Sequence, residues 1–347
     1  MMKTFMEQEA KSAPKLVEKQ FVENQKQLTD LAHTLKQNPP PFVMTVGRGS
    51  SDHACTFAKY LFETQLGWPT VSATPSVTTL YHSSLQLKHA LVIGISQSGQ
   101  SPDICEVMQS AALAGAITVA LVNEVNSPLA QQAQWVIPLR AGKEQAIAAT
   151  KSFITSLSTL IQMVALITED RAFKQHLSSL PSLLTQAWEM DWSAAIPLLA
   201  PIDHSFILGR GFGLPIAEEA ALKLKETCAI QAEALSGAEV LHGPFALIQK
   251  NRPYWVFTQQ DQTLESLLSL ANKIKTLGGQ VILTTAEKNN EAQAASTLLL
   301  PLPKSSHPIY DAVLNIQAFY KMAAHLALAR GLNPDSPLHL HKITETR

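Results

Sequence analysis

The stretch that decides the fold of this chain reads Leu91-Val92-Ile93-Gly94-Ile95-Ser96-Gln97-Ser98-Gly99-Gln100-Ser101. Its apolar run has the length of a buried strand and ends in a loop with three serines and a glycine. Pro102 then opens what we expect to be a helix. Serine hydroxyls and free backbone N–H groups at the start of a helix can surround a phosphate. The same pattern also fits an ordinary connection between a strand and a helix, so the rest of the chain decides between the two interpretations.

Strand-like and helix-like segments alternate on both sides of this stretch. Residues 1–37 have apolar positions at helical spacing, and Pro39-Pro40-Pro41 ends that helix. Beyond it we expect helices after the turn Gly47-Arg48-Gly49-Ser50-Ser51 and over 102–113 and 150–167, and strands over 42–46, 69–73, 90–95, 117–122 and 135–139. Short loops between alternating strands and helices predict a parallel sheet covered by helices on both faces.

The second half of the chain repeats this order. Val46-Gly47-Arg48-Gly49 matches Leu208-Gly209-Arg210-Gly211 at an offset of 162 residues, and at the same offset Ser96-Gln97 falls on Thr258-Gln259. Landmarks in one order at nearly one spacing indicate two copies of one unit. We therefore predict an α/β fold of two tandem, doubly wound, flavodoxin-like parallel-sheet subdomains with an N-terminal helix.

The predicted boundaries follow from this repeat and from the prolines between the two copies. Pro181, Pro197 and Pro201 punctuate a helical connector. The segments are 1–38 for the N-terminal helix, 39–170 for the first subdomain, 171–203 for the connector, 204–330 for the second subdomain and 331–347 for a C-terminal tail.

The two copies differ where a ligand would bind. In the second copy the serine loop becomes Thr258-Gln259-Gln260-Asp261-Gln262, which lacks serine and contains a carboxylate that would repel a phosphate. We therefore expect an anion site in the first copy only. The second copy instead carries a charged helix over 218–226. The pattern indicates that one copy binds the anion and the other supplies charged groups.

Composition excludes several classes of protein. The 347 residues suffice for two domains, and 27 basic side chains balance 28 acidic ones, so nothing favours a nucleic acid or a membrane as partner. Cys55, Cys105 and Cys228 are too widely spaced to suggest a disulfide framework or a zinc site. The sequence has no run of about 18 apolar residues, and charges interrupt its beginning. We therefore expect a soluble cytoplasmic protein.

Several polar side chains are candidates for chemistry or for a purely structural role. Lys223 and Glu226 are three residues apart and share a helix face, although this spacing alone is typical of a solvated ion pair. His242 lies in a predicted loop, and imidazole is suited to moving protons near neutral pH. Ser50 or Ser51 fits the N-cap of the helix that follows as well as a ligand contact.

With these residues the chain resembles the sugar isomerase (SIS) domain family, and within it the isomerase half of glucosamine-6-phosphate synthase. The resemblance covers about 40–345 and includes the serine loop, the first glycine turn and the helix over 218–226. It also includes the segment Ala146-Ile147-Ala148-Ala149-Thr150-Lys151, the histidine loop Gly237-Ala238-Glu239-Val240-Leu241-His242-Gly243-Pro244 and the tail Leu340-His341-Lys342. Two departures are Ser101 in place of the usual threonine and Ala149 in place of the synthase's serine.

The resemblance implies a role for each matched residue. The phosphate would be bound by Ser51, Ser96, Gln97, Ser98 and Ser101, and the sugar by Gly49, Ile147 and Ala148. Glu226 would move a proton between C1 and C2, His242 would assist ring opening, and Lys223 and Lys342 would contact the open-chain sugar. The family also implies a homodimer in which His242 reaches the neighbouring subunit's site, with the tail over the active site. No metal or organic cofactor is implied.

The resemblance also implies a reaction. The synthase carries an N-terminal glutaminase domain, whereas this chain begins Met1-Met2-Lys3, about 40 residues before the first expected strand, so we expect no glutamine-derived ammonia. We therefore expect the chain to be most similar to SIS-type glucosamine-6-phosphate deaminases, which yield fructose 6-phosphate and ammonia. The alternatives are a deaminase, isomerase or deglycase for another amino-sugar phosphate, such as galactosamine 6-phosphate or a fructosamine phosphate, and a phosphosugar sensor without catalysis. A DNA-binding regulator is disfavoured because residues 1–37 are short and not strongly basic.

Overall fold

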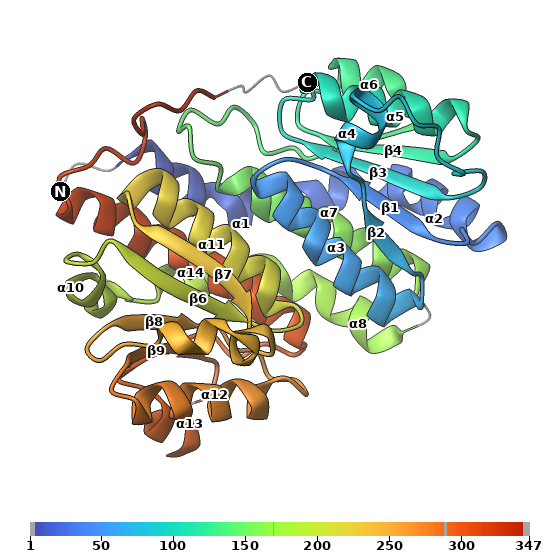
Figure 1. The fold of residues 1–347 in the computed structure, drawn as a ribbon. Helices are drawn as coiled ribbons and strands as arrows, with labels where there is room; N and C mark the ends of the chain where they lie inside the picture. Colours follow the sequence, from blue (N-terminus) through green and yellow to red (C-terminus); the bar gives the residue numbers. More distant parts are fainter. Residues whose placement is uncertain (1–3, 169, 288–289, 343–347) are drawn as a thin grey trace. The chain divides into compact units, whose positions relative to one another are not determined.

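The computed structural model describes residues 4–168, 170–287 and 290–342, and the chain divides into two compact units (Figure 1). We call one the first-sheet unit, which consists of Lys15–Glu144, Lys151–Ser178 and His341–Arg347. The other is the second-sheet unit, which consists of Met1–Pro14, Gln145–Thr150 and Ser179–Leu340. Each unit contains one sheet of five parallel strands. The predicted α/β class with two tandem subdomains is confirmed.

The first-sheet unit has the strand order β2-β1-β3-β4-β5. Its strands are β1 (Val43–Val46), β2 (Thr70–Ser72), β3 (Leu91–Ser96), β4 (Ile117–Val122) and β5 (Trp135–Pro138). The central strand β3 pairs with β1 and β4 and is buried along its whole length. A strand with neighbours at both edges and helices on both faces has no solvent-facing side, which explains the unbroken apolar run before Ser96.

Helices cover both faces of this first sheet. On one face α2 (Gln25–Gln37) and α3 (Ser50–Leu66) pack against α7 (Lys151–Ile167). On the other, α5 (Pro102–Leu113) packs against α4 (Pro75–Thr79) and α6 (Pro128–Gln132) (Figure 1). Buried side chains such as Val92, Ile104 and Met108 fill the space between the sheet and α5. The short helices α8 (Arg171–His176) and η1 (Leu177–Ser179) follow α7.

The second-sheet unit repeats this architecture with the strand order β7-β6-β8-β9-β10. Its strands are β6 (His204–Gly209), β7 (Gln231–Ser236), β8 (Pro253–Val256), β9 (Gln280–Thr285) and β10 (Leu298–Pro301). The predicted repeat is confirmed element by element, since β5 begins at Trp135 and β10 begins 163 residues later at Leu298. The same spatial order of corresponding strands shows that the topology is duplicated as well as the sequence.

The helices of the second-sheet unit also form two layers. α14 (Pro308–Ala329) packs against α11 (Gly213–Cys228) and α9 (Leu180–Glu189), and α12 (Leu264–Thr276) packs against α13 (Asn290–Ala295) (Figure 1). The short helices are η2 (Ser193–Ala195), α10 (Ile196–Leu199), η3 (Glu239–His242) and η4 (Pro244–Leu247). Within the described ranges, no helix has the length and apolar character needed to cross a bilayer.

The N-terminal helix is present but is divided into α1 (Phe5–Glu23) and α2. The division lies at Asn24, whose buried side chain donates to the carbonyl of Pro138 at 2.7 Å and accepts from Nε of Arg140 at 2.6 Å. The break therefore lets Asn24 bind the end of β5. The structure thus refines the expectation of one continuous helix over 1–37.

The strand order places two loops of the first-sheet unit at a point where ligands commonly bind. Strand order reverses between β1 and β3, so the chain leaves these neighbouring strands toward opposite faces of the sheet. In open α/β sheets the resulting crevice lies outside the carboxyl ends of the strands. The glycine turn after Val46 and the serine loop after Ile95 follow these ends. The subdomain boundaries given above stay a prediction.

Candidate active site

The serine loop folds back on itself through its own hydroxyls. Ser96, at the end of β3, is buried, and its Oγ accepts the N–H of Gly99 at 3.0 Å. Oγ of Ser98 accepts the N–H of Gln100 at 3.3 Å. The backbone carbonyl of Gln97 accepts the N–H of Asn123 from the loop after β4 at 3.2 Å. These bonds give the loop a compact, fixed backbone before it meets α5.

Gly99 is required by the shape of this loop. Its φ is +63°, which side chains rarely tolerate, and a Cβ at this position would lie 2.1 Å from Oγ of Ser127. Ser127 is itself held in place as the N-cap of α6, where its Oγ accepts the N–H of Ala130 at 3.4 Å. Only glycine therefore lets the backbone run this close to α6.

Hydroxyls without a capping role lie at two helix starts beside the serine loop. Ser101 is the N-cap residue of α5, but its side chain accepts no capping hydrogen bond in the described structure. α3 begins at Ser50 after Gly49, which has φ +55° and serves as the N-cap residue. The proposal that Ser50 or Ser51 is that N-cap is therefore wrong. Because Ser51 and Ser101 are only partly buried, their hydroxyls can reach a ligand at these positive helix ends.

The two loops are joined by an ion pair that the sequence interpretation missed. Arg48 donates from Nε at 2.8 Å and from Nη2 at 2.6 Å to one carboxylate oxygen of Asp103. The Asp103 side chain is only 1% exposed, whereas that of Arg48 is 51% exposed. The guanidinium thus neutralises a carboxylate in the first turn of α5 that would otherwise repel a phosphate. The signal in the sequence was an arginine between two glycines and an aspartate two residues after Ser101.

The equivalent loop of the second-sheet unit is closed by its own side chains. Nε2 of Gln259 donates to the carbonyl of Arg210 at 2.6 Å and to Oγ1 of Thr263 at 2.9 Å. Oδ1 of Asp261 accepts the N–H of Thr263 at 2.8 Å, so a carboxylate occupies the place of an anion at the start of α12. This arrangement agrees with the expected loss of the anion site in the second copy.

The charged helix of the second copy contains a buried lysine between two carboxylates. Nζ of Lys223 lies 2.5 Å from Oε2 of Glu226 and 3.5 Å from Oε1 of Glu219. The Lys223 and Glu219 side chains are fully buried, and that of Glu226 is 21% exposed. Tyr320 of α14 donates its hydroxyl to Oε1 of Glu219 at 3.1 Å. The interpretation of Lys223 and Glu226 as a solvated ion pair is therefore wrong, because the lysine has no access to water.

This cluster has the organisation of a reactive centre. The buried ammonium holds the buried Oε2 of Glu226, whose side chain as a whole keeps 21% of its exposure. Burial of charge is costly, and buried charged clusters are found at active sites as well as in structural ion-pair networks. Glu219 and Tyr320 were missed from the sequence, although Glu219 lies one helical turn before Lys223 and could have been found by that spacing.

The remaining predicted residues are distributed over both units. His242 is exposed at the end of η3. In the second-sheet unit, Ala148 is fully buried and the N–H of Ile147 donates to the carbonyl of Asp335 at 3.1 Å. In the first-sheet unit, Nζ of Lys342 donates to Oε2 of Glu144 at 3.2 Å. The structure brings Lys223 to Glu226 and the glycine turn to the serine loop, and the binding and catalytic roles of all the predicted residues stay a prediction.

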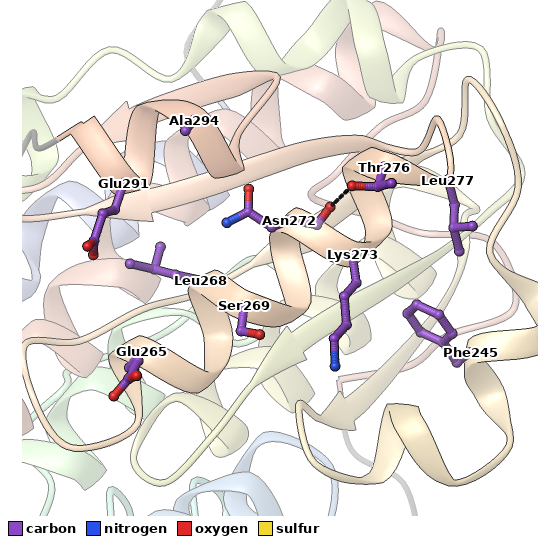
Figure 2. Close-up of a pocket in the computed structure, with 10 residues that line it drawn as sticks. All are labelled: Phe245, Glu265, Leu268, Ser269, Asn272, Lys273, Thr276, Leu277, Glu291 and Ala294. Carbon is purple, nitrogen blue, oxygen red and sulfur yellow. Dashed lines mark hydrogen bonds between the residues drawn. The ribbon is translucent and has the colours of Figure 1, made fainter.

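A pocket of about 710 Å³ lies outside these residues, along α12 (Figure 2). Its charged side chains are Glu265, Lys273 and Glu291, and Phe245 of η4 also lines it. Its other lining residues are Leu268, Ser269, Asn272, Thr276, Leu277 and Ala294. None of the predicted phosphate-binding or catalytic residues, all of which lie in the described part of the chain, lines this pocket.

The family model of the SIS domain matches this chain twice, over residues 42–166 and 198–326. The two matches fall on the two copies of the repeat and include the serine loop, the charged helix over 218–226 and the histidine loop. The glutamine–fructose-6-phosphate aminotransferase (isomerizing) of Aquifex aeolicus is 33% identical over 307 residues, which are 86% of this chain and 51% of that protein. The chain therefore spans about half the length of the curated relatives it matches.

Two solved structures are similar over nearly the whole chain. A provisionally assigned phosphosugar isomerase from Silicibacter pomeroyi has a TM-score of 0.89 and 37% identity, with 96% of this chain and 100% of that chain covered. The C-terminal domain of glucosamine-fructose-6-phosphate aminotransferase from Francisella tularensis has a TM-score of 0.84 and 25% identity, with 97% of this chain and 99% of that domain covered.

Proposed function

The chain belongs to the SIS domain family, and from that premise we propose that it is an aldose–ketose isomerase of sugar phosphates that deaminates glucosamine 6-phosphate. The products would be fructose 6-phosphate and ammonia. The observation that carries the proposal is the fully buried ammonium of Lys223, 2.5 Å from a carboxylate oxygen of the partly exposed Glu226.

The buried cluster supports a catalytic role over a role in binding alone. A sensor of phosphosugars needs the serine loop and the sugar contacts, but it has no use for a lysine buried between two carboxylates. Removing such groups from water costs several kcal/mol per ion, and this cost cancels most of their mutual attraction. A carboxylate held by a buried cation on a rigid helix is instead suited to proton transfer at carbon.

The proposed reaction needs groups from both copies of the repeat. Ser51, Ser96, Ser98 and Ser101, with Gln97 and the helix starts, bind the phosphate through neutral donors. His242 moves a proton from the anomeric hydroxyl to the ring oxygen and so opens the ring. Glu226 then takes the proton from C2 and returns it at C1, while Lys342 stabilises the negative charge on the C1 oxygen and the fully buried Lys223 acts by holding Glu226. A proton passes from the nitrogen to the C1 oxygen, which leaves a hydroxyl at C1 and an imine at C2. Water adds to the resulting C2 imine, its oxygen becomes the ketone oxygen of fructose 6-phosphate, and nitrogen leaves as ammonia.

Other parts of the proposal concern assembly and setting. The exposed position of His242 suits a homodimer in which this residue serves the neighbouring subunit's site. Each step above uses only acid–base groups and water, so we propose a reaction without a metal or an organic cofactor. We also propose that the reaction takes place in the cytoplasm.

A second candidate substrate is another amino-sugar phosphate. Ile147 and Ala148, which we propose to line the sugar site with Gly49, have apolar side chains and cannot donate hydrogen bonds to sugar hydroxyls. Hydroxyl configuration would then be recognised by backbone groups, which is compatible with galactosamine 6-phosphate or a fructosamine phosphate as well.

The test is to incubate the protein with each amino-sugar phosphate and to assay ammonia and the ketose phosphate together. Equal amounts of ammonia and fructose 6-phosphate from glucosamine 6-phosphate, at a higher kcat/KM than from the other substrates, are expected. Preference for another substrate would move the assignment to that sugar. Binding of all of them without turnover would indicate a sensor and refute the enzyme.

A further inference from the structure

Glu9, on α1, binds the backbone of the segment that we propose to line the sugar site. Its carboxylate, in a residue that is only 6% exposed, accepts the N–H of Gln145 at 2.5 Å and the N–H of Ala146 at 3.2 Å. Hydrogen bonds to an ionised acceptor are stronger than neutral ones. Glu9 therefore fixes two successive peptide groups immediately before Ile147.

Asp335 fixes the next peptide group and the start of α1 at the same time. Its backbone carbonyl accepts the N–H of Ile147 at 3.1 Å. Its carboxylate accepts the N–H groups of Phe5 and Met6, both at 2.8 Å, in the first turn of α1. A carboxylate at this end of a helix satisfies free donors and complements the helix dipole. We call residues 145–151 the sugar segment. The N–H groups of its first three residues thus donate to Glu9 of α1 or to Asp335, the residue that caps α1.

The first turns of α1, which make these contacts, are themselves buried and hydrogen-bonded to α14. Met6 and Ala10 are fully buried, and Nε2 of the buried Gln317 on α14 donates to the carbonyl of Ala10 at 3.0 Å. On the same two helices, the Glu7 carboxylate lies 3.6 Å from Nε2 of His325. These turns therefore belong to the second-sheet unit, which also carries Lys223 and Glu226.

We propose that Glu9 and Asp335 are positioning residues that orient the backbone of the partly exposed Ile147 toward the sugar. The inference rests on the proposed function, because it takes Ile147 as a sugar contact. Since the side chain of Ile147 is apolar, the only hydrogen-bonding groups it offers a sugar are on the backbone, and neighbouring peptide groups set the direction of those groups. Neither Glu9 nor Asp335 touches the substrate.

The same contacts anchor the tail that carries Lys342. Asp335 lies seven residues before Lys342 in the sequence, and Nζ of Lys342 donates to Glu144, the residue before Gln145. The tail is thus tied to the sugar segment at Ile147 and immediately before that segment at Glu144. Loss of the Asp335 contacts should therefore disturb the sugar segment and the approach of Lys342 together.

The test compares two ligands that share a phosphate and differ in the sugar. The probes are 2-amino-2-deoxyglucitol 6-phosphate, an open-chain analogue that cannot isomerise, and inorganic phosphate, each measured by calorimetry. Glu9→Gln should lower the affinity for the analogue by about 10-fold and leave the affinity for inorganic phosphate unchanged. Glu18→Gln, which removes an exposed carboxylate from the same helix, should change neither. Glu9→Asp keeps the charge and should recover part of the loss.

Each failure points to a different step of the reasoning. Equal preference for the analogue in Glu9→Gln and wild type would overturn the inference while leaving the proposed function intact. A wild-type protein that prefers the analogue but turns over no amino-sugar phosphate refutes the function, and the ratio of affinities still tests the positioning role. If Glu9→Gln does not fold, Asp335→Asn, which weakens the α1 contacts, must show the same selective loss. A wild-type protein with no preference for the analogue overturns the positioning role, and the turnover of amino-sugar phosphates then decides the proposed function separately.

Discussion

Replacing Lys223 with methionine removes the cation from the buried cluster on α11. At an effective dielectric constant of about 20, charges 3.5 Å and 2.5 Å apart attract by about 5 and about 7 kcal/mol, and most of this attraction offsets the cost of burial. Removing one partner of a buried ion pair typically costs about 3–5 kcal/mol. We therefore expect Lys223→Met to lower the free energy of unfolding by this amount near neutral pH.

Urea unfolding of the wild type, of Lys223→Met and of the double variant with Glu219→Gln measures this cost. The double variant should recover part of the stability, because the fully buried carboxylate of Glu219 is then gone. A loss below about 1 kcal/mol, as expected of an exposed pair, would refute the description of the cluster as a buried ion-pair network.

Two further predictions concern carboxylates elsewhere in the structure. Arg48→Met should remove the cation that pairs with the buried Asp103 carboxylate beside the serine loop. The affinity for inorganic phosphate, measured by calorimetry, should then fall by about 10-fold, and adding Asp103→Asn should restore that affinity. An unchanged affinity in Arg48→Met would exclude this role. Burial raises the pKa of the Asp311 carboxyl, so the folded state favours its protonated form and stability falls as pH rises through that raised pKa. In urea unfolding, Asp311→Asn should flatten the part of the stability profile that lies above the ordinary pKa of an aspartate, and a profile like that of the wild type would contradict it.

The fold followed from the sequence because its signals are local and repeated. The apolar run before Ser96 matches a strand paired on both sides, and the matching glycine turns after Val46 and Leu208 mark corresponding strands of two sheets with one topology. The divergence of the serine loop from Thr258-Gln259-Gln260-Asp261-Gln262 also indicated which copy could bind an anion. These features depend on the spacing of apolar residues and on the residue types in turns, and both are visible within a short stretch of sequence.

The electrostatics of the candidate site did not follow from the sequence, because they depend on contacts between distant segments. The spacing of Lys223 and Glu226 places them on one helix face but does not reveal that α14 packs against α11 and buries the lysine. Likewise, nothing local links Arg48 to Asp103 or Glu9 to Gln145. Charged pairs of this kind are recognised only when the fold has brought their segments together.

The central claim is that Glu226 transfers the proton in a reaction that releases ammonia from glucosamine 6-phosphate. The direct measurement is the rate of ammonia and fructose 6-phosphate formation by the wild type and by Glu226→Gln, with inorganic phosphate binding measured in parallel. The account predicts equal release of both products by the wild type and a loss of kcat of at least about 100-fold in Glu226→Gln, with phosphate affinity unchanged. Wild-type turnover in Glu226→Gln, or no turnover by the wild-type protein, would contradict it.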